Sequence, residues 1–204
     1  MEVLDLKKRL AKLYKPSARM PVLVKVPPMR FLMIDGKGGL GGPDFQDAIK
    51  SLYGLAYPVK FAARKQLHLS YPVMALEGLY WNADGGEDIS PGDRDALSWR
   101  LMIMLPDAVP GELVESTRVK VAVKKELPRL ADIRVQTFSE GQSVQILHVG
   151  PYADEPATVE LLFAFAAEHG FEIAGAHHEI YSGDPNRAAQ EKLKTVLRYP
   201  VRKL

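Results

Sequence analysis

The sequence predicts an α+β protein built as a pseudo-two-fold tandem repeat, in which each repeat runs strand, helix, strand, strand. Two observations lead to this class. The stretches "MRFLMIDGKGGLGGPDFQDAIKSLYG" (29–54) and "SVQILHVGPYADEPATVELLFAFAAEHG" (143–170) share one order: a strand-like run, a glycine-containing turn, an acidic residue near proline, and a helical segment that ends at glycine. Each stretch is then followed by two extended runs, the last of which ends at proline.

The first repeat is expected to cover about residues 22–107. An acidic residue beside proline favours a helix start and glycine favours a helix end, so its helix is expected to run from Asp44 to Gly54. The stretches 67–81 and 99–106 are then the two remaining strands.

The second repeat is expected to cover about residues 135–204. By the same chemistry its helix starts near Asp154 and ends at Gly170. The stretches 171–182 and 193–200 follow as strands.

Two helices are expected outside the repeats, within a single domain of residues 1–204. Residues 111–127 form an inter-repeat helix, although their β-branched residues weaken the prediction. Near the N-terminus, apolar residues recur with helical spacing beside a basic side. This narrow stripe, with no aromatic residue apart from Tyr14 at its end, favours a helix docked on the domain over one that binds a membrane surface or a partner.

The repeats are expected to enclose a central cleft. Each unit would form a small antiparallel sheet with a helix on one face, and the twin unit would cover the other face. Seams of this kind are common places for small-molecule sites.

Composition excludes several classes of function. Lys plus Arg (27) nearly equals Asp plus Glu (25), and the net charge of +2 provides no broad field for nucleic acid, so no direct nucleic-acid partner is expected. The absence of cysteine excludes disulfides, thiolate metal sites and cysteine nucleophiles. Without an apolar run of ~18 residues or a signal peptide, a cytoplasmic protein with no membrane partner is expected, as monomer or homodimer.

Glu179 in "HHEIYSGDP" (177–185) is the most informative polar residue, because strands rarely carry Glu at interior positions. Alternation along a strand places His177 and Tyr181 on the same face as Glu179. Either this face is directed into the cleft, or Glu179 is a solvated residue of an edge strand. Spacing alone leaves both interpretations open.

If Glu179 lines the cleft, its expected neighbours include Trp81 and Trp99. Aromatic faces and a carboxylate both attract a cation, and removal from water suits a carboxyl group to proton transfer. Tyr152 in "GPY" and Tyr57 in "GLAYP" either pack in turns or line the mouth of the cleft.

Other chemical motifs are weak. The glycine-rich "GKGGLGG" (36–42) lacks the spacing of a phosphate-binding loop and is interpreted as a turn. A metal site at His177 and Glu179 would need a third ligand, such as His148, and no metal or cofactor is expected. No serine-nucleophile motif occurs, and Lys194 and Arg198 are interpreted as part of a solvated face.

Several blocks of the chain together resemble the stand-alone branch of the GyrI-like family of small-molecule-binding domains. These blocks are "VPPMRFLMIDGKG" (26–38), "FQDAIKSLYGLAYPVKF" (45–61), "LEGLYW" (76–81), "WRLMIMLPD" (99–107), "LHVGPY" (147–152), "HEIYSGDP" (178–185) and "EKLKTVLRYPV" (191–201).

The resemblance implies a tandem strand-helix-strand-strand fold with a glutamate at the base of a central cleft, here Glu179 in "HEIY". In regulators with this domain, such a glutamate recognises cationic aromatic compounds. Some stand-alone members hydrolyse cyclopropane-bearing DNA-alkylating compounds. The resemblance then implies Trp81 and Trp99 as clamps, Glu179 as base or electrostatic stabiliser, and Tyr181 as hydrogen-bond donor. A helix-turn-helix module is not found, so direct control of transcription is not expected.

Three hypotheses follow for function. The first is a hydrolase of electrophilic aromatic xenobiotics, and the second is a non-catalytic sensor or sequestering binder of cationic aromatic compounds. The third is an interaction protein whose cleft has no ligand.

Overall fold

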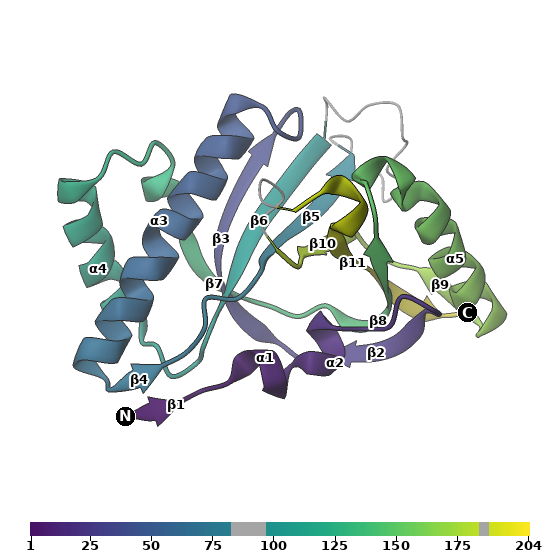
Figure 1. Ribbon diagram of the computed structural model, residues 1–204, viewed down its shortest axis with the longest axis horizontal. Coiled ribbons are helices and arrows are strands. Elements are labelled where there is room, and N and C mark those ends of the chain that lie inside the picture. The colour runs from purple at the N-terminus through teal and green to yellow at the C-terminus, as the bar shows by residue number, and fades with distance from the viewer. Residues whose placement is uncertain (83–96, 184–187) are drawn as a thin grey trace.

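A computed structural model describes residues 1–82, 97–183 and 188–204, so the last two residues of the block "HEIYSGDP" lie outside the described ranges. Antiparallel strands form one large sheet, with a helix over each half (Figure 1). The helices are α1 (Leu6–Arg9), α2 (Ala11–Tyr14), α3 (Pro43–Gln66), α4 (Gly111–Lys124) and α5 (Glu155–Glu168), with short 3-10 turns η1 (Leu130–Asp132), η2 (Tyr152–Asp154) and η3 (Gln190–Lys192).

The strands of the large sheet are β2 (Val22–Val26), β3 (Met29–Lys37), β5 (Leu76–Asn82), β6 (Leu97–Leu105), β7 (Arg134–Phe138), β8 (Gly141–Val149), β9 (Phe171–Ile173), β10 (His177–Tyr181) and β11 (Lys194–Lys203). A small parallel pair is formed by β1 (Glu2–Val3) and β4 (Leu69–Ser70).

The predicted α+β class and tandem repeat are confirmed. One unit is β3, α3, β5, β6 and the other is β8, α5, β10, β11. In the sheet these strands lie in the order β8-β11-β10-β5-β6-β3, which is symmetric about the central β10–β5 pair. The units therefore meet edge to edge, whereas the expected arrangement had each unit covering a face of its twin. Pairing β5 with β10 satisfies backbone groups that two separate sheets would leave exposed at their edges.

The outer strands are exchanged between the units. β2 precedes the first unit in the chain but pairs with β8 of the second. β7 precedes the second unit but pairs with β3 of the first. The strand that precedes each unit in the chain thus extends the half of the sheet that the other unit forms.

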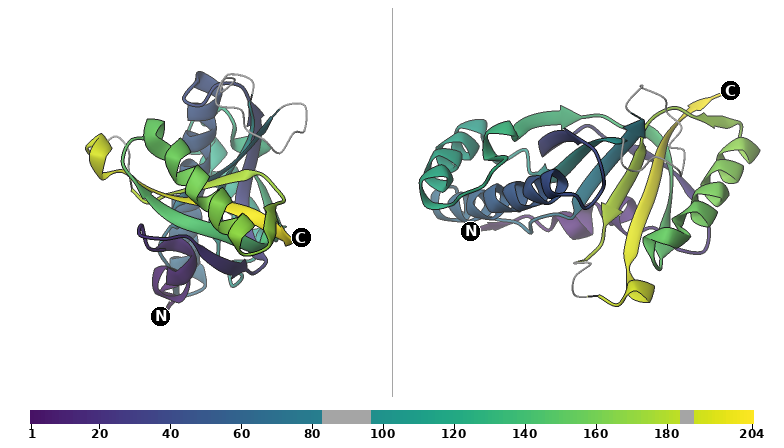
Figure 2. Two further views of the ribbon diagram at one scale, coloured as in Figure 1. Left: turned by 90° about the vertical axis from the view of Figure 1, so that its right-hand side faces the viewer. Right: turned by 90° about the horizontal axis from the view of Figure 1, so that it is seen from above.

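The two long helices occupy the same face of the sheet, α3 on one unit and α5 on the other, and the right-hand view of Figure 2 shows them well apart along the sheet. Trp99 of β6 packs against Phe45 of α3, and Leu197 of β11 packs in a cluster with Leu162 of α5. Helix α4 packs on the outer side of α3 (Figure 1).

The predicted end of the first repeat helix at Gly54 is wrong, because α3 continues to Gln66 through both Gly54 and Pro58. The apolar face of the helix persists beyond Gly54, with Val59 and Ala63 fully buried. Gly54 serves close packing: a Cβ atom there would lie 2.5 Å from a methyl group of Leu127.

The other helix predictions agree with the structure. In the second unit α5 ends at Glu168, and Gly170 follows with a φ of +76°, a left-handed conformation that favours glycine after a helix. The inter-repeat helix is α4.

The N-terminal segment forms two short helices, α1 and α2, which lie beneath the strands in the view of Figure 1. Leu6 and Leu13 are buried against the domain, in agreement with a docked helix. Among the described residues, no helix is both long enough and apolar enough to cross a membrane.

Candidate functional site

The central strand β10 carries a hydrogen-bonded cluster on the face that α3 and α5 share. The Nε2 atom of His177 lies 2.8 Å from Oε1 of Glu179, and the hydroxyl of Tyr181 donates to Oε2 of Glu179 at 2.7 Å. These are the three residues that alternation along the strand placed together. Because β10 lies between β5 and β11, and Glu179 is 8% exposed, Glu179 is not a solvated edge-strand residue.

Aromatic side chains surround this carboxylate. The hydroxyl oxygens of Tyr80 and Tyr181 are 2.5 Å apart. The ring of Tyr152 meets that of Tyr181 edge-on, with 6.1 Å between centroids, and His177 lies 4.9 Å from the ring of Tyr199. Since Tyr181 gives its only hydroxyl proton to Glu179, Tyr80 must donate to Tyr181. The result is a donor chain from Tyr80 through Tyr181 to the carboxylate.

Three tyrosines of the cluster remain protonated phenols. Burial, followed by the negative charge of Glu179, raises the pKa of Tyr80 and of Tyr181 well above the ordinary value. Burial and the charges of Glu179 and Glu155 likewise raise the pKa of Tyr152. All three hydroxyls therefore keep their protons at neutral pH, and Tyr80 and Tyr181 use theirs in the donor chain.

Trp81 does not lie with Glu179, contrary to the expectation. In the β5–β10 pairing His177 is opposite Tyr80, so Tyr80 points to the face of Glu179 and Trp81 points to the other face. There the guanidinium of Arg100 lies 6.0 Å from the indole ring. Alternation correctly placed Trp81 and Tyr80 on opposite faces of the sheet. It could not say which of these two residues shares a face with Glu179.

Trp99 lies on the expected face but is not a clamp with free surface. It is fully buried beneath α3, where its ring meets Phe45 edge-on at 5.2 Å. The neighbouring Gly36 lies so close that a Cβ atom there would be 2.1 Å from the indole. Trp99 is therefore a core residue that supports the sheet.

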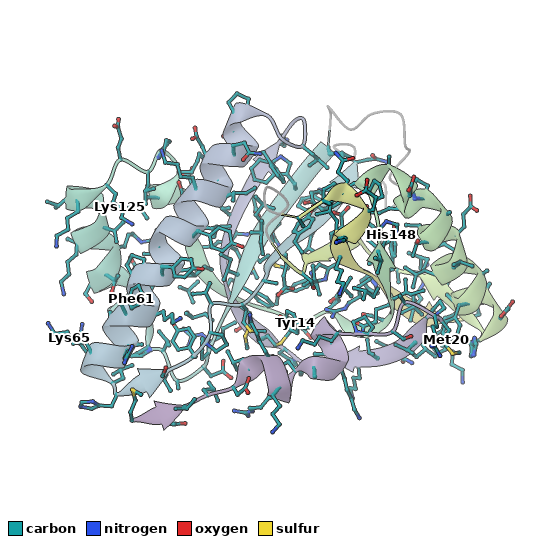
Figure 3. All side chains as sticks on the ribbon, viewed as in Figure 1. Tyr14, Met20, Phe61, Lys65, Lys125 and His148 are labelled. Atoms are coloured by element: carbon teal, nitrogen blue, oxygen red, sulfur yellow. The ribbon has the colours of Figure 1, made fainter. Side chains whose placement is uncertain are left out.

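Of the remaining predicted site residues, one lies in the cluster and two lie elsewhere. Tyr152 joins the cluster, whereas Tyr57 lies half exposed on α3 and contacts Tyr53. His148 is bonded to Thr158 and to the carbonyl of Pro151, so it is not the third partner of His177 and Glu179; Figure 3 shows it beside α5.

Glu155 is a site residue that the sequence did not indicate. It is buried at the first position of α5, and its carboxylate, His177 and Glu179 offer ligand atoms within 4.8 Å of one another. These atom types could bind a divalent cation. In the structure, however, both oxygens of Glu179 already accept hydrogen bonds from His177 and Tyr181. In sequence, an acidic residue before Pro156 is also typical of an ordinary helix start, which concealed its role.

A cavity of about 20 Å³ adjoins the cluster, lined in part by Tyr152, Tyr181 and Leu193. This volume is sufficient for about one water molecule.

The opposite face of the same strands carries a buried ionic network. His178 of β10 bonds through Nδ1 to Glu140 at 2.9 Å and through Nε2 to Glu77 at 3.0 Å. Arg198 bonds to the second oxygen of Glu140 at 3.0 Å, and the hydroxyl of Tyr14 donates to Glu77 at 2.6 Å. Arg198 is fully buried, so its interpretation as part of a solvated face is wrong.

This network attaches the N-terminal segment to the sheet. Arg198 donates to the carbonyl of Leu13 at 2.7 Å, and Gln145 donates to that of Lys12 at 2.7 Å. Tyr14 is labelled in Figure 3, on the helix that closes this side. The network lies directly behind Glu179, on the other side of the sheet. Its members Glu77, His178 and Arg198 are each adjacent in sequence to a residue that points to the face of Glu179.

The network predicts a pH-dependent stability. Burial alone would lower the pKa of His178, but the charge of Glu140 and the hydrogen bonds to Glu140 and Glu77 raise it from 6.5 to about 9. The stabilisation from the protonated ring is therefore complete below about pH 6.5 and is lost as pH rises through about 9. We expect the unfolding free energy in urea to fall by on the order of 1–3 kcal/mol between about pH 6 and about pH 9.5.

In His178→Gln, whose side chain does not titrate, this decrease should be absent. An equal decrease in both proteins would assign it to other groups. A second effect is expected at acid pH. Burial alone would raise the pKa of Glu140, but His178 and Arg198 lower it from 4.5 to about 2. The stability that ionised Glu140 contributes is therefore lost only as pH falls from about 4.5 through about 2.

Comparison with known proteins identifies similar sequences and structures. The family model described as GyrI-like small molecule binding domain matches residues 19–202. An uncharacterized conserved protein from Listeria innocua is 37% identical, with a TM-score of 0.90 over 98% of this chain and 100% of that chain. A hydrolase from Listeria innocua is 35% identical, with a TM-score of 0.87 over 98% and 100%.

The C-terminal domain of EcmrR shares the fold, at 16% identity and a TM-score of 0.58 over 91% of this chain and 98% of that chain. A comparison with curated proteins finds no match.

Proposed function

Because the chain belongs to the family of GyrI-like small-molecule-binding domains, we propose that it binds planar aromatic compounds at Glu179 and hydrolyses electrophilic, cyclopropane-bearing members of this class. The observation that carries the proposal is a buried carboxylate whose two oxygens accept hydrogen bonds from His177 and Tyr181 inside a shell of aromatic rings. The 35% identity to a hydrolase that matches over its full length supports an enzymatic activity.

Binding would use the tyrosines in the place first expected for tryptophans. Tyr152 and Tyr181 offer rings beside Glu179, and a ring face attracts a cation by ~0.5–2 kcal/mol. The carboxylate adds a fixed negative charge in a water-poor site. A cavity of about 20 Å³ cannot hold a polycyclic compound, so ligand entry requires side chains around Tyr152 and Tyr181 to move apart.

Catalysis would be addition of water to the strained ring. The water oxygen forms a bond to a cyclopropane carbon, the adjacent ring C–C bond breaks, and its electron pair moves into the conjugated carbonyl system. Glu179 takes the proton from the attacking water and, once neutral, holds the hydroxyl of Tyr181 less strongly. That hydroxyl then turns to donate its hydrogen bond to the developing phenolate-like oxygen. Transfer of the proton from Glu179 to that oxygen gives a product heavier than the substrate by one water.

The second candidate function is a non-catalytic sensor or sequestering binder of cationic aromatic compounds. The donor chain favours this function independently, since His177 and Tyr181 hold Glu179 in place as a ready counter-charge without any reaction. Pre-orientation of this kind lowers the entropic cost of binding.

The test is calorimetric titration with a planar aromatic cation such as ethidium, an uncharged planar analogue, and a cyclopropane-fused cyclohexadienone, with mass spectrometry of the same samples. A product heavier by one water supports the hydrolase. Binding of the cation without any product from the cyclohexadienone supports the binder. If none of the compounds binds or reacts, the site assignment is wrong. Intrinsic fluorescence would be a poor readout, since Trp81 lies across the sheet and Trp99 lies in the core.

A further inference from the structure

A groove between α3 and α4 lies outside the Glu179 cluster. It has a volume of about 330 Å³ and is lined by parts of the two helices, with no residue in common with the cluster. Figure 1 shows α4 on the side of α3 that is away from α5. Nothing in the proposed reaction uses this groove.

The floor and one lip of the groove are apolar. Pro58 and Ala62 of α3 face Thr117 and Val121 of α4, and the last two are almost completely buried. Pro58 and Ala62 are too small to fill the space between the helices. Phe61 at the lip is 58% exposed, which is unusual for a phenylalanine and leaves its ring available to a ligand.

The other lip is cationic. Lys120, Lys124 and Lys125 line the groove and are exposed. Lys120 and Lys124 are one helical turn apart, so their ammonium groups lie on the same side of α4. Among the described residues, none of the three forms an ion pair, whereas Arg118 of the same helix pairs with Glu115. Figure 3 shows Phe61 and Lys125 on the side of the molecule where these helices pack.

We propose that this groove binds an amphipathic monoanion, namely an alkyl or aryl carboxylate. Its apolar chain would lie along Pro58, Ala62 and Val121, and its carboxylate would reach Lys120 and Lys124. Charge complementarity determines the sign of the ligand, because the described residues that line the groove include three cations and no carboxylate. The volume is near the lower end of the range for small-molecule sites, ~300–1,000 Å³, which suits a single medium-length chain.

The chain would then hold two small-molecule sites with opposite charge preference. Glu179 selects cations in a buried aromatic cluster, and the lysine groove selects anions at the surface. The two sites are separated by α3, so one substitution can test each without altering the other.

The test is calorimetric titration with decanoate, decylammonium and decanol, which share one chain and differ in the head group. Decanoate is expected to bind with one-to-one stoichiometry and roughly tenfold or more tighter than the other two probes. The variant Lys120→Ala/Lys124→Ala should weaken decanoate binding by about tenfold. Its control, Lys7→Ala/Lys8→Ala, removes the same charge from exposed positions of α1 and should leave binding unchanged.

A second variant, Ala62→Phe, fills the groove without changing charge and should abolish decanoate binding; circular dichroism verifies that it remains folded. Glu179→Gln should bind decanoate as the unaltered protein does, which separates this inference from the proposed function. Equal affinity for decanoate and decylammonium, equal weakening by both lysine pairs, or full binding to folded Ala62→Phe would each overturn the inference.

Discussion

Glu179→Gln is expected to lower the rate of hydration of an uncharged cyclopropane-bearing substrate by about 10²–10⁴-fold, the usual contribution of a positioned general base. The amide has almost the shape of the carboxylate, and its carbonyl oxygen can still accept the hydrogen bond from Tyr181. It cannot take a proton from water. Affinity for the same uncharged substrate should change by less than about tenfold, or ~1.4 kcal/mol. Single-turnover kinetics with mass-spectrometric detection, together with calorimetry, measure both quantities.

The matched control is Glu160→Gln, which makes the same chemical change at an exposed position of α5 and should alter neither quantity. Tyr181→Phe tests the donor separately, because it removes the hydroxyl that joins Tyr80 to the carboxylate. If Glu179→Gln retains full turnover, Glu179 is not the base. If the unaltered protein has no turnover and Glu179→Gln loses only cation binding, the binder is correct.

Arg198→Met is expected to destabilise the protein by about 3–5 kcal/mol, since removal of one partner of a buried ion pair leaves the other charge uncompensated. Arg198 and Glu140 have side chains that are each 1% exposed, and the guanidinium bonds to Glu140, Gln145 and the carbonyl of Leu13. Methionine fills much of the same volume but replaces none of these bonds. Urea unfolding at neutral pH measures the change.

Arg202 provides a close control on the same strand. It pairs with Glu172, but the two side chains are 65% and 43% exposed, so Arg202→Met should cost less than about 1 kcal/mol. Similar losses in both variants would mean that burial of the Arg198 network contributes little. A loss confined to Arg198→Met would show that the buried network stabilises the fold, whereas the exposed pair does not.

The tandem repeat could be predicted because the same order of local sequence patterns occurs twice in the chain. Strand-helix-strand-strand order depends on local patterns, and the stretches from Met29 and from Ser143 contain the same patterns. How the units meet depends on which edges pair, and no local pattern encodes the contact of β5 with β10. The end of α3 was misplaced for a related reason. Gly54 is typical of a helix end, yet tertiary packing against Leu127 requires it within the helix.

In the site, too, contacts within one strand could be predicted from the sequence, whereas contacts between different elements could not. The contacts of His177, Glu179 and Tyr181 arise within one strand, where alternation is a reliable guide. Tyr80 and Glu155 come from other elements, so their approach depends on strand register and on the docking of α5. Trp81 was misplaced because it is one residue away from Tyr80 in register, and a shift by one residue changes the face.

The exchanged outer strands have a consequence for synthesis of the protein. β2 leaves the ribosome early, but its partner β8 follows more than a hundred residues later. β3 likewise lacks one of its neighbours until β7 has been made. The first half of the chain therefore cannot complete its sheet by itself as it emerges, and closure of both halves is a late and shared event. Such long-range pairing slows folding, and exposed strand edges in the interval favour association with chaperones.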